Sequence, residues 1–301
     1  MNFTNLHLHS TWSILDAIIK PNDLASLLSD FNQQACAITD HASIGAWYDI
    51  NDAFKEKNIK PIFGCEFYCR TTYTGEKTKD RRHLIVLAKN QQGLYNIRKL
   101  NKIANDNFYY KPILSYEELW KNPDGLVITS ACALGDIGEA LMKDDYQKAY
   151  KIAENFYEKF GEDYYLELQM HPKFEAQAKI NEGIVTLNDE LGIPTIVTSD
   201  SHFLNPEDAN VRNIIEAIGY HKNIEDVYQS MESNSLGSPD RIKLWAEQSG
   251  FEHEDILKKS FKNTIDITNK CNAQLEEPQV RIPEFNRYEE LDALFDEDWW
   301  C

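Results

Sequence analysis

The segment ACAITDHASIGAWYDINDAFKEKNIKPIFGCEFY, residues 35–68, contains the pattern that decides the fold. Its two ends, residues 35–40 and 60–68, are short apolar runs of the kind that form buried strands. Between them, residues 43–57 repeat apolar side chains at helical spacing. A strand, a helix and a second strand in this order are typical of a βαβ unit in a parallel sheet.

The same alternation continues on both sides of this segment. We predict further strands over residues 3–9, 81–88, 125–130, 164–169 and 194–199, and helices over 21–32, 91–104, 146–160 and 176–191. At least seven strand-then-helix steps in one direction favour a parallel sheet, and their number suits a closed barrel better than an open sheet. The sequence therefore predicts the α/β class.

From about residue 210 the pattern changes to helices alone, predicted over 211–218, 240–249 and 255–269. We divide the chain into a barrel over about residues 1–210, a helical extension over about 211–275 and an acidic, flexible tail over 276–301. Residues 271–301 contain nine acidic residues and two Arg. The ending LDALFDEDWW, residues 291–300, is either a peptide that docks on a partner or a solubilising tail.

Composition excludes several classes of protein. The chain has 301 residues and a formal net charge of −18. No apolar run approaches the roughly 18 residues of a membrane helix, so we expect no membrane partner. Six unclustered Cys do not form a disulfide framework, so we expect reduced thiols in a cytoplasm. An acidic chain repels polyanions at long range, so nucleic-acid binding would need local cations such as metals, or a basic partner.

Side chains that bind metals gather where the predicted strands end. His7 and His9 are two residues apart on one strand, so both rings point to the same face. Catalytic groups of β/α barrels gather at the carboxyl ends of the strands, so residues in different strands should converge there. The other residues of this kind are Asp40, His41, Glu66, Asp200 and His202, with His83 near the start of a strand.

A cluster of imidazole and carboxylate groups suits Zn, Mn or Fe, and several carboxylates can bridge two metals. Close metals lower the pKa of a bound water and clamp the oxygens of a transferring phosphoryl group. Each element alone has another explanation. A single His-x-His pair is more often a packing feature, and a single Cys such as Cys132 is more often a small core residue. Their joint placement after different strands favours a metal site.

The ordered motifs resemble the polymerase and histidinol phosphatase (PHP) family, and within it the amino-terminal PHP domain of bacterial replicative DNA polymerases. The resemblance covers roughly residues 1–275. Its motifs are HLHS (7–10) with LD (15–16), ITDH (38–41), GCE (64–66), RHL (82–84), SAC (130–132) and SDSH (199–202). YLELQ (165–169) and FLNPEDA (203–209) are similar to the polymerase branch in particular.

The resemblance implies a distorted (β/α)7 barrel that holds three divalent transition metals. Their identity, Zn, Mn or Fe, does not follow from the residues, although a Cys132 thiolate favours Zn over Mg. All nine implied positions carry a competent ligand here, which favours an active enzyme. By the family pattern the three metals would be held by His7, His9, Glu66 and Asp200, by Glu66, His83 and Cys132, and by Asp16, His41 and His202.

The resemblance also implies attack of a metal-bound hydroxide on a phosphodiester, in polymerase-linked relatives as a 3′-5′ exonuclease that proofreads. Asp40 would orient a ligand or accept a proton, or instead cap the next helix. Gln169 and His171 share a strand face with Glu167, and Arg82 is next to His83, so these are candidate substrate contacts. A solvated strand end and an ordinary surface charge are the alternatives.

Three functions stay open on the sequence alone: a DNA exonuclease, a phosphomonoesterase on a small phosphate, and a catalytically silent, metal-stabilised scaffold of the replisome. The two polymerase-like segments favour the exonuclease. We expect DNA as a partner, single-stranded or at a primer 3′ end, together with a replicative polymerase or another replisome protein. The chain offers no pair of polymerase carboxylates in its remaining tail, so we expect no polymerase activity.

Overall fold

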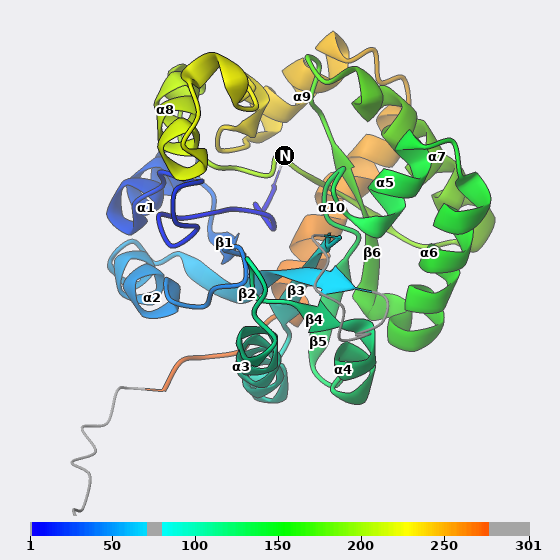
Figure 1. Ribbon diagram of the computed structural model, residues 1–301, viewed down its shortest axis with the longest axis horizontal. Helices are drawn as coiled ribbons and strands as arrows, with labels where there is room; N and C mark the ends of the chain where they lie inside the picture. The colour runs from blue at the N-terminus through cyan, green and yellow to red at the C-terminus, as the bar shows by residue number, and fades with distance from the viewer. Residues whose placement is uncertain (1, 71–79, 277–301) are drawn as a thin grey trace, which may run out of the picture.

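The computed structural model describes residues 2–70 and 80–276, so the predicted tail and its LDALFDEDWW ending lie outside the described residues from 277 onward. A curled sheet forms the centre of the molecule and helices surround it (Figure 1). The α/β class is confirmed. The strands are β1 (Ala35–Ile38), β2 (Lys60–Arg70), β3 (Arg82–Ala88), β4 (Leu114–Ser115), β5 (Leu126–Thr129), β6 (Tyr164–Gln169) and β7 (Thr195–Thr198).

Within the described residues the strand order is β1-β2-β3-β5-β6-β7, with β4 beside β2. The predicted helices are present, with ends that shift by a few residues, whereas β4, α4 and α5 were not predicted. The helices are α1 (Pro21–Asp30), α2 (Trp47–Glu56), α3 (Gln91–Asp106), α4 (Tyr116–Lys121), α5 (Asp136–Met142), α6 (Tyr146–Phe160), α7 (Glu175–Leu191), α8 (Ala209–Tyr220), α9 (Pro239–Gln248) and α10 (Glu254–Lys270).

Local sequence explains several helix ends. α1 begins at Pro21, whose missing N–H is not needed in a first turn. The side chain of Asn90 accepts a hydrogen bond from Gly93 N and so caps α3. α7 ends at Leu191, because the next residue, Gly192, adopts the left-handed conformation that stops a helix.

The sheet is mixed, so the prediction of a parallel sheet is wrong at one strand. β3 pairs antiparallel with β2, with His83 opposite Tyr68, and also antiparallel with β5. A parallel neighbour needs a crossover connection, usually a helix, and the sequence predicts no helix between β2 and β3. The reversal matters for the site, because it brings the start of β3 to the edge where the parallel strands end.

Residues 3–9 do not form the regular strand that we predicted. They run extended between the two edges of the sheet, with isolated parallel bridges from Asn5 to Cys36 and from Leu8 to Ser201. The segment pairs first with β1 and then with the residues after β7. Neither set of backbone hydrogen bonds is therefore long enough to define a strand. Backbone hydrogen bonds of 2.8 Å on either side nevertheless join β1 to the residues after β7, so this segment closes the curled sheet.

Alternation along β2 separates two environments. Phe63, Cys65 and Phe67 point outward into the core beneath the surrounding helices. Ile62 points inward, where it belongs to a cluster with Ile85 of β3 and apolar residues of the other strands. Further along the inward face the sequence becomes polar. The interior of the curled sheet is therefore filled by apolar side chains at one end and by ionisable side chains at the other.

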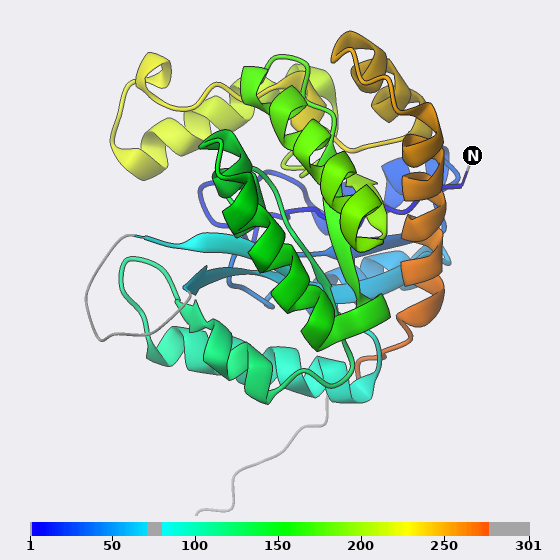
Figure 2. The ribbon, with the colours of Figure 1, turned by 90° about the vertical axis from the view of Figure 1, so that its right-hand side faces the viewer.

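The helical extension packs on the sheet in two places. α10 lies against β7, and its Leu257 and Phe261 share one apolar core with the helices around the sheet. Figure 2 shows α10 along one side of the sheet and α8 at the opposite side. Among the described residues, none of the helices combines the length and apolarity that a membrane span requires.

Candidate metal centre

Glu66, on the inward face of β2, lies at the centre of the predicted ligand set. Its Oε1 is 2.8 Å from His83 Nδ1 and 3.5 Å from His7 Nε2. Its Oε2 is 2.7 Å from His41 Nδ1 and 3.2 Å from His9 Nε2. One fully buried carboxylate therefore faces four imidazoles. They come from the extended segment of residues 3–9, from the end of β1 and from the start of β3.

Asp200 completes the side of the cluster that His7 and His9 form. Its Oδ1 is 3.1 Å from His7 Nε2 and 3.3 Å from His9 Nε2. Asp200 follows β7 with a φ of 46°, a left-handed conformation in which Asp is among the more tolerant residues. We refer to His7, His9 and Asp200 as the deep side of the centre.

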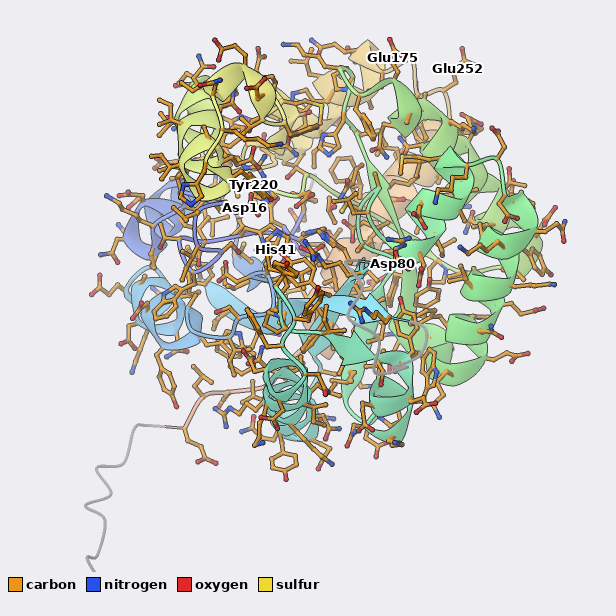
Figure 3. All side chains as sticks on the ribbon, viewed as in Figure 1. Asp16, His41, Asp80, Glu175, Tyr220 and Glu252 are labelled. Atoms are coloured by element: carbon orange, nitrogen blue, oxygen red, sulfur yellow. The ribbon has the colours of Figure 1, made fainter. Side chains whose placement is uncertain are left out.

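Asp16 and His41 form the opposite side, together with His202. Asp16 Oδ2 is 2.8 Å from His41 Nε2 and 3.6 Å from His202 Nε2. Figure 3 shows Asp16 close to His41 near the middle of the molecule. His202 Nδ1 lies 2.8 Å from the backbone oxygen of Asp200, so it carries the proton and leaves Nε2 available toward Asp16. We refer to Asp16, His41 and His202 as the outer side.

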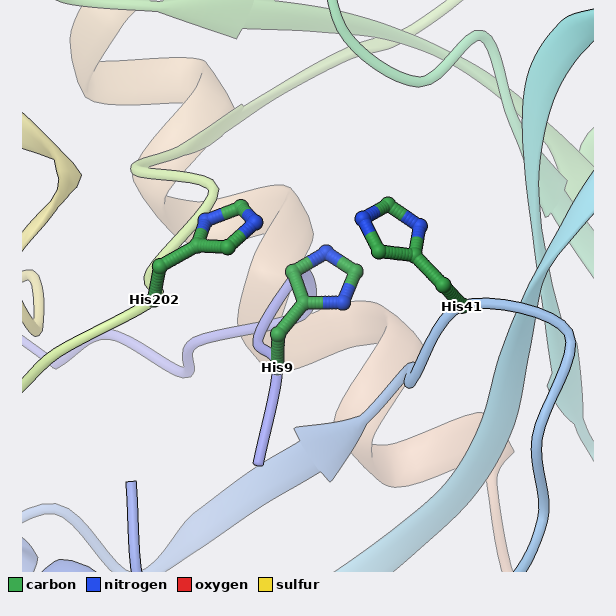
Figure 4. A group of neighbouring side chains, drawn as sticks. All are labelled: His9, His41 and His202. Carbon is green, nitrogen blue, oxygen red and sulfur yellow. The ribbon is translucent and has the colours of Figure 1, made fainter. Parts of the chain in front are cut away.

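Three imidazoles lie side by side across the two sides. The ring centre of His9 is 4.2 Å from that of His41 and 4.4 Å from that of His202. Figure 4 shows that the three rings come from three separate segments of the chain. Histidines that carried full charge would repel one another at this spacing, so the group needs either carboxylates beside charged rings or neutral rings, and neutral rings are the form that binds a metal.

Cys132 lies next to His83, on neither the deep side nor the outer side of the cluster. Its Sγ is 3.6 Å from His83 Nδ1. The loop after β5 brings it there, because the N–H of His83 donates to Leu134 O at 3.1 Å. Every one of the nine predicted ligand residues therefore contacts another member of the set.

The donor atoms of this cluster fit a divalent metal centre. In the described residues, six of the eleven buried side-chain N and O atoms without a hydrogen-bond partner belong to it. Leaving such atoms unpaired is costly, and a metal about 2.0–2.2 Å from each ligand removes the cost. The six are His7 Nε2, His9 Nε2, His41 Nδ1, both oxygens of Glu66 and Asp200 Oδ1.

Three overlapping groups of side chains have ligand atoms within 4.8 Å of one another. Imidazole and carboxylate ligands of this kind suit Zn, Mn or Fe, and sharing Glu66 would place two ions close together. The groups are His7, His9 and Glu66; His41, Glu66 and His83; and His9, His41 and His202.

The electrostatics of the cluster favour added positive charge. Burial alone would raise the pKa of Glu66, but His83 and His41 hold it well below its usual range. Burial alone would lower the pKa of His41, but Glu66 and Asp16 raise it to about 10. The carboxylates are thus ionised and attract positive charge, which either protons or metal ions can supply.

Glu167 of β6 orients the deep side, a role that sequence reasoning missed. Its Oε1 is 2.6 Å from His7 Nδ1, and the hydroxyl of Thr129 donates to its Oε2 at 2.6 Å. Gln169 Nε2 also donates to Glu167 at 2.8 Å. This carboxylate holds the proton of His7 on Nδ1 and turns Nε2 toward the cluster. The signal in the sequence was the shared strand face of residues 167 and 169.

Asp40 acts on the cluster through two serines. It accepts hydrogen bonds from Ser10 N at 2.7 Å and from the hydroxyl of Ser13 at 2.8 Å, and Ser13 Oγ is 3.1 Å from His9 Nδ1. Asp40 therefore positions the loop that orients His9. The alternative of a helix cap is wrong, because α2 starts after Ala46 without a side-chain cap.

Arg212 of α8 was not predicted at all. Its Nη2 is 2.6 Å from Asp16 Oδ1, and its Nε donates to Asp16 O at 2.9 Å. The same Nη2 is 2.9 Å from Glu216 Oε1. An Arg and a Glu four residues apart are typical of an exposed helix surface, so no pattern in the sequence distinguished this buried pair.

The three candidate substrate contacts have protein partners. Gln169 is buried against Glu167, as described above, and His171 Nδ1 is 2.8 Å from the hydroxyl of Ser233. Arg82 is 2.6 Å from Glu139 and 2.8 Å from Asp80. A substrate role for these three stays a prediction.

Comparison with known proteins gives the following matches. The model of the PHP domain family matches residues 5–171. DNA polymerase III subunit alpha of Borreliella burgdorferi is 34% identical over 277 residues, covering 90% of this chain and 24% of the relative. The subunit of Aquifex aeolicus is 32% identical over 286 residues, covering 89% of this chain and 24% of the relative. The chain therefore spans about a quarter of the length of these curated relatives.

Among solved structures, one similar chain is a two-domain protein from Bacteroides vulgatus that contains a predicted PHP-like metal-dependent phosphoesterase. It is 11% identical, with a TM-score of 0.41, and the match covers 82% of this chain and 63% of that chain.

Proposed function

Because this chain belongs to the PHP domain family, we propose that it is a metal-dependent phosphodiester hydrolase, specifically a 3′-5′ exonuclease on DNA. One observation carries the proposal. Among the described residues, six buried nitrogen and oxygen atoms that could bind a metal, and that have no hydrogen-bond partner, converge around Glu66. The polymerase III alpha relatives support DNA as the substrate and replication as the setting, with a replicative polymerase as partner in the cytoplasm.

The ligand assignment follows the contacts. When bound, divalent ions supply an activated water and neutralise the charge of a phosphoryl group during its transfer. Glu66 would be a ligand common to two of the sets, since each of its oxygens faces a different pair of imidazoles. The three sets would be His7, His9, Glu66 and Asp200; Glu66, His83 and Cys132; and Asp16, His41 and His202.

The side chains around the ligands prepare them for this task. Glu167 fixes the proton of His7 on the nitrogen that faces away from the centre. Ser13 holds His9, and Asp40 holds Ser13. Burial raises the pKa of the Cys132 thiol, and Asp200 and Glu66 raise it further, so the thiol ionises only beside a strong cation.

Exposure indicates where a phosphate reaches the centre. The side chains of His7, His9 and Glu66 are fully buried, whereas Asp16 is 25% exposed and His83 is 12% exposed. A phosphodiester therefore approaches from the side of Asp16, His41 and His83. On the deep side His7 and His9 are fully buried, and Asp200 is 15% exposed.

Purified protein tests the proposal directly. We expect transition metal in the protein by elemental analysis, and stepwise shortening of a 5′-labelled single strand from its 3′ end with Mn²⁺ or Zn²⁺. Glu66→Gln should abolish both. A protein that holds metal but hydrolyses only p-nitrophenyl phosphate would be a phosphomonoesterase, and one that holds metal without any turnover would be a scaffold. Either result would overturn the exonuclease.

A further inference from the structure

We propose that Tyr68, Arg81 and Lys111 form a lip that receives a single-stranded nucleic acid beside the metal centre. This inference rests on the proposed function, because it assigns the means by which that centre would hold its substrate. The lip is built from the end of β2, the residue before β3 and the segment between α3 and β4. None of the three residues belongs to the ligand set or to the candidate substrate contacts.

Tyr68 connects the lip to the metal centre. Its ring stacks on His41 at 5.4 Å between ring centres, with 17° between the planes. It also meets the edge of His83 at 5.2 Å. These two imidazoles are on the partly exposed edge of the centre. Tyr68 is only 6% exposed, so it holds the two cations beside the place where a phosphate arrives and does not itself offer a face to a base.

Two cations lie over the Tyr68 ring. Arg81 Cζ is 5.4 Å from the ring centre and Lys111 Nζ is 5.6 Å from it. Burial lowers the pKa of Lys111, while Asp16 raises it and Arg81 lowers it, so all three charges are close enough to interact. In the part of the chain that the structure describes, neither cation has an ion pair with a carboxylate.

This lack of pairing separates the lip from other basic side chains near the sheet. Arg82 pairs with Glu139, Arg212 pairs with Asp16, and Lys270 pairs with Asp163. The chain as a whole has a net charge of −18 and repels a polyanion at long range. Two cations without carboxylate partners beside the centre therefore supply the local attraction that a phosphate backbone needs.

Exposed aromatic rings extend the lip outward. Phe108 is 62% exposed and Tyr110 is 59% exposed, immediately before Lys111. A bridge between Tyr109 and Lys111 shapes this segment, and Tyr110 has a φ of 58°. Aromatic side chains beside cations are the common means of binding single strands without sequence preference, because every base can stack.

The opposite approach to the centre offers less to a phosphate. Figure 3 shows Asp80, the neighbour of Arg81, and Tyr220 of α8 on different sides of His41 in that view. On the α8 side the guanidinium of Arg212 already bonds Asp16, Glu216 and Ser230. The strand would therefore enter over the lip rather than over α8.

The test compares the full chain with the double variant Arg81→Gln, Lys111→Gln. The matched control is Lys258→Gln, Lys262→Gln on α10, which removes two exposed charges on the side of the sheet away from α8. The probes are a fluorescent oligothymidylate, whose binding is measured by anisotropy over a range of salt concentrations, and the p-nitrophenyl ester of thymidine 5′-monophosphate, whose hydrolysis is measured with Mn²⁺. Metal content and thermal unfolding establish that each variant is folded.

We expect the lip variant to bind the oligonucleotide about tenfold more weakly, with the slope of log affinity against log salt reduced by about 1.4, since each phosphate contact on a single strand contributes about 0.7. The control should match the unmodified chain, and the lip variant should lose less small-ester hydrolysis than strand binding, because a single phosphate makes fewer contacts than a strand. Phe108→Ala should weaken strand binding without changing the salt slope, because it removes stacking and no charge.

The proposal that the lip binds the strand would be wrong if the lip variant bound the strand as well as the unmodified chain does. It would also be wrong if strand binding and small-ester hydrolysis fell equally. Competition by polyglutamate as strong as that by unlabelled oligothymidylate would overturn it too, because an acidic peptide has no bases to stack. If the unmodified chain hydrolyses neither substrate, the proposed function fails. The binding measurements still decide the lip in that case, because they need no turnover.

Discussion

The deep side and the outer side of the candidate metal centre both contact Glu66 but are built differently. On the deep side, His7 and His9 come from the segment that closes the sheet, and Glu167 orients His7 from within the sheet. On the outer side, Asp16 lies in a loop and is held by Arg212 of the helical extension. The curled sheet therefore shapes one half of the centre, whereas the other half depends on a helix that follows the sheet in the chain.

Removing the shared residue should have the largest effect. Glu66→Gln keeps the shape of the side chain and removes the charge that faces four imidazoles. We expect metal affinity to fall by more than the roughly 100-fold that changes in outer partners cost, both for the deep ion and for the ion of His83 and Cys132, because Glu66 belongs to both sets. Elemental analysis after dialysis measures it. The exposed Glu158→Gln is the control, and metal retained by the Glu66 variant would break the assignment of a shared ligand.

Glu167→Gln should separate the two sides. The amide can donate to His7 Nδ1 and so favours the other tautomer, with the proton on the nitrogen that faces the centre. We expect deep-side affinity to fall about 10- to 100-fold while the outer side keeps its ion. Competition with a chelator of known affinity measures each step. Equal weakening of both steps would mean that the two sides are not independent.

Arg212→Gln should affect the outer side. It removes the charge from Asp16 while leaving a side chain that can still donate a hydrogen bond. We expect about tenfold weaker binding of the outer ion only, with partial recovery in Arg212→Lys. Metal stoichiometry distinguishes this positioning role from a general loss of stability, since destabilisation would not select one ion. Loss of the deep ion as well would contradict the comparison.

Ser13→Ala should have the smallest effect. The hydroxyl contacts His9 Nδ1 and donates to Asp40, and it also accepts from the N–H of His41. Losing it should destabilise the fold by about 1 kcal/mol and weaken metal binding about threefold. Denaturant unfolding and the chelator titration measure the two quantities. A loss as large as that of Glu167→Gln would show that orientation of His9 matters as much as that of His7.

The sequence predicts which side chains converge better than it predicts the residues that position them. His7 and His9 were predictable because two-residue spacing puts both side chains on one face of an extended segment. The direction of β3 was not predictable from strand-then-helix counting, although the absence of a helix before Arg82 was the available signal. Arg212 was not predictable because the same spacing occurs on ordinary helix surfaces, and only burial separates the two cases.

The extended segment from Asn5 to His9 is also the seam of the sheet, because it joins β1 to the chain that follows β7. Ions bound by His7 and His9 would stabilise the pairing of this segment with both edges of the sheet. Loss of that pairing would therefore be coupled to release of the ions. Heat resistance should therefore rise with the logarithm of free metal concentration, and a chelator should loosen the amino-terminal residues before it affects α6 or α7.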